Sequence, residues 1–249
     1  MTLTPETPPV ADLPLEEQAY RRLRQALMAG VFAPGDKLSI RRIAEALGTS
    51  PMPARTALRR LAIEQAVDVL PSGTAIVPRL TRSAFLELST IRATLEPLAV
   101  RLAAPRLDTA TLQTLKSLLA EHDAARSTGQ PERFLRVDRE FLFTLYQKAD
   151  APMLLGMIEA LWLRRGPLFW EARWVLMSRP QDKAHRHGPL LEALSQGDAA
   201  AAARELEVEI NDATALLLRE IRFQGDPAAN ALARLGEKAS KIRSKLKLD

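Results

Sequence analysis

The sequence lacks several features that would mark particular classes of protein. It has no cysteine among its 249 residues, which excludes a disulfide framework and any metal site built on thiolates. No stretch approaches the ~18 consecutive apolar residues of a membrane-spanning helix. The first residues, MTLTPETPPVADLPLEE, are rich in proline and acid and lack the basic-then-apolar pattern of a secretory signal. We therefore expect a cytoplasmic protein with no membrane partner.

Sequence motifs of the common enzyme classes are also missing. There is no Gly-x-Ser-x-Gly elbow, no Gly-x-x-x-x-Gly-Lys phosphate loop, no Gly-x-Gly-x-x-Gly turn and no His-Glu-x-x-His helix. The three histidines are His122, His185 and His187, and none has the glutamate three residues earlier that a di-metal helical oxidase requires. We expect no enzymatic activity.

A helix-turn-helix pattern is present between Ser39 and Leu61. Apolar residues recur at i, i+3, i+4 and i+7 in two successive segments, as on one face of each of two short helices. The first segment has Ile40, Ile43, Ala44 and Leu47, and the second has Ala54, Ala57, Leu58 and Leu61. Ser39 is placed to cap the first helix, Gly48 to end it, and Pro51 to open the second. Two short helices with a tight glycine turn predict a helix-turn-helix.

A small β-hairpin is predicted directly after the second helix. Residues 67–70 and 74–77 form two short strand-like segments around a Pro71-Ser72-Gly73 turn, which gives the winged form of the motif. Positive charge gathers in the same region, because residues 20–60 hold nine Lys or Arg against two acidic residues. Such an excess is what binding to a polyanion requires.

The region is similar to the winged helix of GntR-family transcriptional regulators. The residues that carry the resemblance are Gly30, Pro34-Gly35, Leu38, Ala44-x-x-Leu47-Gly48, Ser50-x-x-Pro53, Arg55-x-Ala57-Leu58-Arg59-Arg60-Leu61 and the hairpin glycine, Gly73. The family resemblance implies DNA binding by Arg41, Arg42, Ser50, Arg55, Arg59, Arg60, Ser72 and Gly73. The family usually has arginine immediately after Ser50, whereas this chain has Pro51 followed by Met52. A base-reading donor is therefore missing, and we expect an operator unlike the usual one.

Beyond residue 82 the sequence predicts helices only. Turn signals separate six helix-length segments, at residues 83–104, 108–127, 131–148, 152–177, 180–195 and 198–223. The predicted fold is therefore mainly α: a winged helix-turn-helix of three helices and a hairpin, followed by an antiparallel bundle of about six helices. We expect an arm at 1–14, the DNA-binding domain at 15–78, a linker at 79–83, the bundle at 84–224 and a basic tail at 225–249.

The bundle resembles the FCD effector-sensing domain of the FadR-type GntR subgroup. The resemblance rests on Arg92-x-x-x-Glu96, Leu102-Ala103-Ala104, Asp138-x-x-Phe141, and the run from His187 through Gly197-Asp198 to Ala202. It implies an effector site at Arg92, Asp138, His187 and Glu209. Metal-binding members of the family supply one aspartate and three histidines. Here Leu142 and Glu209 replace two of those histidines.

Two interpretations of this altered site remain open. Asp138, His187 and Glu209 could hold one divalent ion (Zn, Ni or Mn), with water completing its shell. Our preferred interpretation has no metal, with these residues paired to Arg92 or binding the effector directly. Buried carboxylates need a positive partner, and Arg92 is our candidate.

Other aromatic and basic residues complete the predicted picture. We expect His122 and His185 on the surface. We expect Trp162, Trp170 and Trp174 in the core or a dimer interface, where tryptophans are common. If Arg164 or Arg165 points inward, an anionic ligand is favoured.

The predicted function is a homodimeric, sequence-specific transcriptional regulator, in the repressor role. It would bind a two-fold DNA operator and respond to a small organic acid held in the bundle. One alternative is a constitutive DNA-binding dimer whose bundle senses nothing. The other is a helical metabolite-binding protein or enzyme with an appended winged helix.

Overall fold

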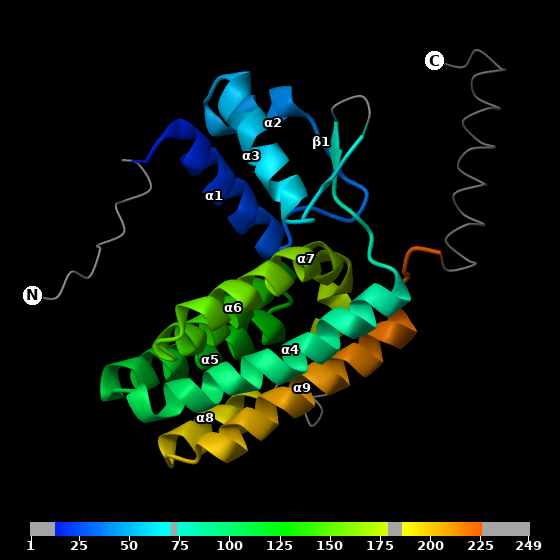
Figure 1. The fold of residues 1–249 in the computed structure, drawn as a ribbon. Helices are drawn as coiled ribbons and strands as arrows, with labels where there is room; N and C mark the ends of the chain where they lie inside the picture. Colours follow the sequence, from blue (N-terminus) through cyan, green and yellow to red (C-terminus); the bar gives the residue numbers. More distant parts are fainter. Residues whose placement is uncertain (1–12, 71–73, 179–185, 226–249) are drawn as a thin grey trace, which may run out of the picture.

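The structure is a computed structural model that describes residues 13–70, 74–178 and 186–225. A small N-terminal unit, which we call the reader, sits on one side of a larger helical bundle (Figure 1). The predicted basic tail beyond Gly225, most of the arm, the wing tip at 71–73 and His185 lie outside the described residues.

Three helices form the body of the reader: α1 (Leu15–Met28), α2 (Ile40–Leu47) and α3 (Pro51–Ile63). Gly48 ends α2 in the left-handed conformation, with φ of 64°, and Pro51 takes the first position of α3. The predicted apolar stripes of α2 and α3 pack against α1 around Leu23 and Leu27. The helix-turn-helix is therefore confirmed. Ser39 precedes α2 as predicted, but its side chain makes no capping hydrogen bond.

The sheet of the reader has three strands rather than the two expected. The predicted hairpin is present as β2 (Asp68–Val69) and β3 (Ala75–Ile76), which pair antiparallel. A further strand, β1 (Lys37–Leu38), pairs with the other edge of β3. Two residues are too few to produce a readable alternation, so only the tertiary pairing reveals β1.

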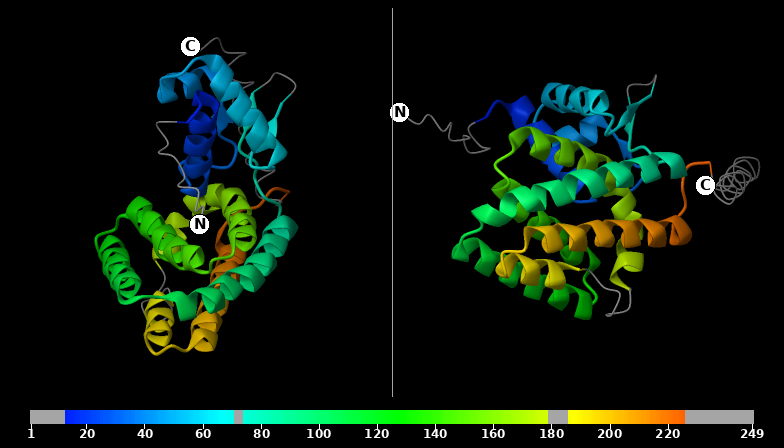
Figure 2. Two further views of the ribbon diagram at one scale, coloured as in Figure 1. Left: turned by 60° about the vertical axis from the view of Figure 1, so that its left-hand side comes forward. Right: turned by 60° about the horizontal axis from the view of Figure 1, so that its bottom comes forward.

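The bundle contains the six predicted helices. They are α4 (Arg82–Ala103), α5 (Thr109–Ser127), α6 (Pro131–Lys148), α7 (Pro152–Met177), α8 (His187–Ser195) and α9 (Ala199–Glu220), with a short 3₁₀ turn at Ala104–Arg106. The long helices α4 and α9 run side by side in opposite directions (Figures 1 and 2). None of the helices within the described ranges is long and apolar enough to cross a membrane.

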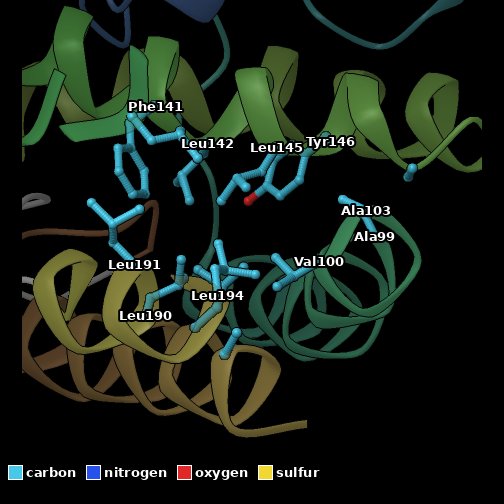
Figure 3. Close-up of a cluster of buried hydrophobic side chains, with 14 of the residues drawn as sticks. Ala99, Val100, Ala103, Phe141, Leu142, Leu145, Tyr146, Leu190, Leu191 and Leu194 are labelled. Carbon is cyan, nitrogen blue, oxygen red and sulfur yellow. The ribbon is translucent and has the colours of Figure 1, made fainter. Parts of the chain in front are cut away.

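Apolar packing holds α6, α8 and α4 together in the middle of the bundle. Figure 3 shows Leu142 and Leu145 of α6 facing Leu190 and Leu194 of α8, with Val100 of α4 beside them. All five side chains are buried. Leu142, which stands where metal-binding members of the family have a histidine, is thus part of the apolar core in this chain.

Helix α7 belongs to both units. Trp162 lies in the bundle core, whereas its neighbour Leu163 is buried in the reader core. Gly166 touches α1 so closely that an added Cβ would lie 1.9 Å from the carbonyl oxygen of Leu27. The segment before α4 is fastened to the same helix, because Arg79 donates to both carboxylate oxygens of Glu171, at 2.7 and 2.6 Å. The reader therefore rests on the central helix of the bundle.

Candidate DNA-reading surface and buried charge cluster

The solvent-facing side of α3 carries a stripe of four exposed residues. Met52, Arg55, Thr56 and Arg59 occur at i, i+3, i+4 and i+7, the spacing of one helix face. Within residues 13–70, 74–178 and 186–225, neither Arg55 nor Arg59 forms an ion pair. Arginines left without acidic partners on an exposed helix face are available to a phosphate or a guanine edge.

Apart from Arg60, the remaining reader residues predicted to bind DNA divide into two groups. Arg41 and Arg42 are exposed at the start of α2, and Ser50 is exposed immediately before α3 without using its side chain as a cap. Ser72 and Gly73 lie in the wing tip, outside the described residues.

The side chain of Arg60 is paired with other residues of the reader. Its Nη1 donates to Glu17 at 2.7 Å, and its Nε lies 3.6 Å from Glu64. The guanidinium also stacks over the ring of Tyr20, 3.5 Å from the ring centre. These contacts join α3 to α1, so Arg60 has a structural role that its sequence position did not indicate.

Three of the predicted effector-site residues come together in the bundle. Asp138 of α6, His187 at the start of α8 and Glu209 of α9 are all buried. The Nε2 atom of His187 lies 3.2 Å from Asp138, and its Nδ1 atom lies 3.0 Å from Glu209. The imidazole is therefore placed between two carboxylates.

The position of this imidazole bears on whether the site fits a metal ion. One ligand atom from each of the three residues lies within 4.8 Å of the others, a spacing that a metal site can have. However, each ring nitrogen already faces a carboxylate. An ion bound at Nε2 would leave Glu209 as the partner of Nδ1 rather than as a ligand. As arranged, these residues suit a protonated imidazole better than a metal ion.

The electrostatics of the cluster favour the same protonated state. Burial alone would lower the pKa of His187, but the carboxylates of Glu209 and Asp138 outweigh burial and raise the pKa to about 10. Apart from His122 and the uncharged tyrosines Tyr20 and Tyr146, the buried ionisable residues within the described ranges are Arg92, Glu96, Asp138, Arg165, His187 and Glu209. With His187 protonated, the positive and negative charges of this set balance.

The arginine beside Asp138 is Arg165, not the expected Arg92. The Nη2 atom of Arg165 lies 3.6 Å from Asp138 Oδ2, and its guanidinium stacks on the rings of Trp162 and Phe169. Burial, and next the positive charge of Arg92, lower the pKa of Arg165 to about 9. It therefore stays charged at neutral pH.

Arg92 pairs with Glu96 on its own helix instead. Its Nε donates to Glu96 at 2.6 Å and its Nη2 at 3.2 Å. Glu96 also accepts hydrogen bonds from the Tyr146 hydroxyl at 2.7 Å and from Trp162 Nε1 at 2.9 Å. Burial and then the charge of Glu96 raise the pKa of Tyr146 well above its ordinary value, so its hydroxyl remains a donor. Glu96 is the centre of a second buried network next to the cluster.

The prediction that His122 lies on the surface is wrong. Its side chain is buried, with its ring centre 4.3 Å from that of Phe134 and 5.2 Å from that of His187. It falls on the same face of α5 as Leu115 and Ala125, which are seven residues before it and three after it. The helical period could therefore have identified it as an inward residue. Trp162 lies in the core as expected, whereas Trp174 is exposed.

The space inside the cluster is small. A cavity of about 30 Å³ lies between Arg92, Asp138, Arg165 and Glu209, with apolar walls from α6, α7 and α9. A single water needs about 10–15 Å³ on this measure. The observed conformation is therefore closed, and an organic acid could enter only if the surrounding side chains moved.

Arg165 is the site residue that the sequence left undecided. The pair Arg164-Arg165 pointed to a basic position on α7, but either residue could have faced inward. The structure places Arg164 on the surface and Arg165 in the interior, 4% exposed. An inward-pointing arginine in this pair favours an anionic ligand, and Arg165 points inward.

Comparison with known proteins agrees with both halves of the structure. Residues 15–77 match the family of bacterial regulatory proteins called gntR, and residues 87–211 match the FCD domain. The chain is 35% identical over 163 residues to the Escherichia coli HTH-type transcriptional regulator McbR, covering 66% of this chain and 74% of McbR. It is 27% identical over 159 residues to the E. coli HTH-type transcriptional repressor RspR, covering 64% of this chain and 70% of RspR.

Solved structures show the same arrangement. The E. coli McbR/YncC structure superposes with a TM-score of 0.78 at 30% identity, covering 84% of this chain and 99% of that one. A putative GntR regulator from Rhodococcus sp. RHA1 has the same fold, with a TM-score of 0.66 at 23% identity, covering 83% of this chain and 99% of that one. From its winged helix, its FCD domain and these relatives, the chain belongs to the GntR family of transcriptional regulators.

Proposed function

We propose that this regulator is a homodimeric repressor of the FadR-type subgroup that releases its operator when a small carboxylate binds beside Arg165. The named repressor RspR, at 27% identity, supports the repressor role. A dimer follows from the way such readers work, with one recognition helix in each half of a two-fold DNA site. The observation that carries the sensing part is the incomplete pairing of Arg165.

Arg165 is a buried cation without a full set of partners. Its contact with Asp138, at 3.6 Å, is longer than the ~2.7–2.9 Å of a strong charge-assisted hydrogen bond. Its Nε atom has no hydrogen-bond partner within the described part of the chain. Leaving a charged donor unsatisfied in the interior is unfavourable. A carboxylate ligand would satisfy the guanidinium through two parallel hydrogen bonds, which a lysine could not offer in the same geometry.

The position of Arg165 connects this site to the reader. The next residue along α7 is Gly166, whose close contact with Leu27 joins the helix to α1. A ligand that draws Arg165 away from Asp138 would shift the part of α7 on which the reader rests. It can change operator affinity only if it binds the two arrangements with different affinity.

We infer that this site works without a bound metal. The protonated His187 and Arg165 already supply the positive charge that Asp138 and Glu209 require. Leu142, at the position where metal-binding relatives place a ligand, is part of the apolar core. The constitutive alternative, in which the bundle only dimerises, predicts no ligand response at all.

The Arg55→Ala variant tests the DNA-reading surface. If Arg55 forms two hydrogen bonds with a guanine, we expect operator affinity to fall by about 5–150-fold per half-site. This loss corresponds to ~1–3 kcal/mol. Discrimination among operator variants should also weaken. Fluorescence anisotropy with a duplex selected by the full-length protein measures both effects.

Arg101→Ala is the matched control, since Arg101 is an exposed arginine on α4 of the bundle. If Arg55→Ala binds the selected duplex as tightly as the Arg101→Ala variant, Arg55 does not belong to the reading surface. A chain that selects no DNA sequence would instead support the helical enzyme or binding-protein alternative.

The second experiment tests the sensor by titrating acetate, pyruvate and succinate into the protein–operator complex. We expect at least one of these acids to reduce operator affinity by roughly 5–150-fold, the usual range of coupling between two sites. The Arg165→Gln variant should lose the response because it lacks the cationic fork. Arg164→Gln should keep it, since Arg164 is the exposed neighbour on the same helix.

The same titrations in EDTA separate the metal-free site from a metal site. We expect unchanged operator affinity and an unchanged response to the acid. Loss of the response in EDTA, with its return on adding zinc, nickel or manganese, would show that the carboxylate binds through an ion. No response to any of the three acids would contradict the sensing proposal and leave the constitutive dimer.

A further inference from the structure

The first turn of the recognition helix presents an apolar side chain to solvent. Met52 is the second residue of α3 and is 63% exposed. Single exposed apolar residues are common on protein surfaces and mean little by themselves. Met52 is distinguished by its position, because it starts the stripe that continues through Arg55 and Arg59.

The backbone of this turn has few donors to offer. A helix normally begins with several unpaired N–H groups, which can bind phosphates or other anions. In α3 the first and third residues are Pro51 and Pro53, so Met52 is the only one of the first three with an N–H. Ser50 carries a hydroxyl, but the first two side chains of α3, the Pro51 ring and Met52, are both apolar and exposed. The side chains that the first turn of α3 itself offers to DNA are therefore apolar.

The DNA major groove has one apolar feature that identifies a base, the C5-methyl group of thymine. In helix-turn-helix proteins the N-terminal residues of the recognition helix contact base edges. Methionine is unbranched and polarisable, so it can adjust to a methyl group without a fixed rotamer. Arg55 follows one turn later on the same face, in position to contact a neighbouring base pair.

We propose that Met52 is a specificity-determining residue that contacts the C5-methyl group of a thymine next to the base pair read by Arg55. This proposal rests on the proposed DNA-reading function and adds the identity of one base to it. It accounts for the missing base-reading donor after Ser50: an apolar contact replaces a hydrogen bond, and thymine becomes the preferred base.

The experiment is a thymine-to-uracil scan of the operator. The full-length protein first selects its site from randomised duplexes, and each thymine of the selected site is then replaced by uracil. Uracil keeps every hydrogen-bonding group and the base pair, and lacks only the methyl group. We expect one position in each half-site where uracil weakens binding roughly fourfold, the value for removing one methyl-sized contact.

The variants assign that position to a side chain. In Met52→Ala the thymine-to-uracil ratio at the sensitive position should fall to about one. Met153→Ala is the matched control and should keep the ratio, because Met153 is also exposed (79%) but lies on α7 of the bundle. If Met52→Ala is poorly folded, the uracil scan is repeated with Met52→Gln. The polar amide of glutamine makes no apolar contact with the methyl group, so the thymine-to-uracil ratio should again fall to about one.

Each outcome decides the proposal. No methyl-sensitive position, or a sensitive position that keeps its ratio in Met52→Ala, overturns it while leaving DNA reading intact. A thymine-to-uracil ratio that Met52→Gln leaves unchanged overturns it as well. Failure of the wild-type chain to select any site overturns the proposed function and this inference together.

Discussion

Replacing Gly166 by alanine is expected to lower the free energy of unfolding by about 3 kcal/mol or more. The added Cβ would lie 1.9 Å from the carbonyl oxygen of Leu27 and 2.9 Å from its carbonyl carbon. Both atoms belong to the backbone of α1, so no flexible side chain can move aside. Overpacking of a well-packed interior usually costs about 1–3 kcal/mol, and a backbone clash lies at or above the upper end.

Gly156→Ala provides a matched control on the same helix. No atom lies within 4 Å of the position where its Cβ would be added. Alanine in a helix interior is favoured over glycine by about 0.8–1.0 kcal/mol, so this variant should be equally or more stable. Urea unfolding at constant protein concentration measures both variants. Equal losses in the two would mean that the contact between α7 and α1 does not hold the units together.

The Gly166→Ala variant should also uncouple the reader from the bundle. If α1 is pushed away from α7, the reader loses Leu163 from its core. We expect the bundle to keep its helical content while the reader melts at a lower temperature, so that unfolding shows two transitions. One sharp transition at the wild-type temperature would contradict this picture.

Glu96→Ala is expected to destabilise the protein by about 3–5 kcal/mol, the usual effect of removing one partner of a buried ion pair. The substitution takes the acceptor away from Arg92, the Tyr146 hydroxyl and Trp162 Nε1 at once. These three donors come from α4, α6 and α7, so the loss reaches across the bundle. Left without Glu96, the guanidinium of Arg92 would remain buried and uncompensated.

Two variants separate the causes of this loss. Glu96→Gln keeps the shape and an acceptor oxygen but removes the charge, so it should be intermediate in stability. Glu87→Ala is the matched control, because Glu87 is an exposed glutamate on the same helix and should change stability by less than about 0.5 kcal/mol. Thermal unfolding followed by circular dichroism gives the comparison. If Glu96→Ala has the same melting temperature as Glu87→Ala, the network around Glu96 contributes little to the stability of the protein.

Local residue patterns determined most of the fold. Helices α6 and α7 begin and end where the sequence predicts, since Pro131 and Pro152 each take a first helical position and turn residues separate the two helices. The helix-turn-helix follows from two apolar stripes and the left-handed Gly48. These signals act within a few residues, so a sequence pattern contains them in full.

Contacts between residues far apart in the chain could not be predicted from local sequence patterns. The strand β1 exists only because β3 lies beside it, and Arg60, although exposed, pairs with Glu17 because that residue, 43 positions earlier, is close in space. The choice between Arg164 and Arg165 depended on how α7 is rotated against α6. Asp138 pairs with Arg165 rather than with Arg92, because Arg92 forms its ion pair with Glu96, one turn further along α4.

The sequence alone thus determined the family of folds, the recognition helix and three of the residues gathered in the bundle, Asp138, His187 and Glu209. Spacing along a helix and the conformations of glycine and proline are local properties, which explains this success. Only the tertiary structure decided which buried charges pair, that His122 points inward, and that α7 supports the reader. Those outcomes depend on the orientation of whole helices against one another, which is set by the packing of side chains far apart in the chain.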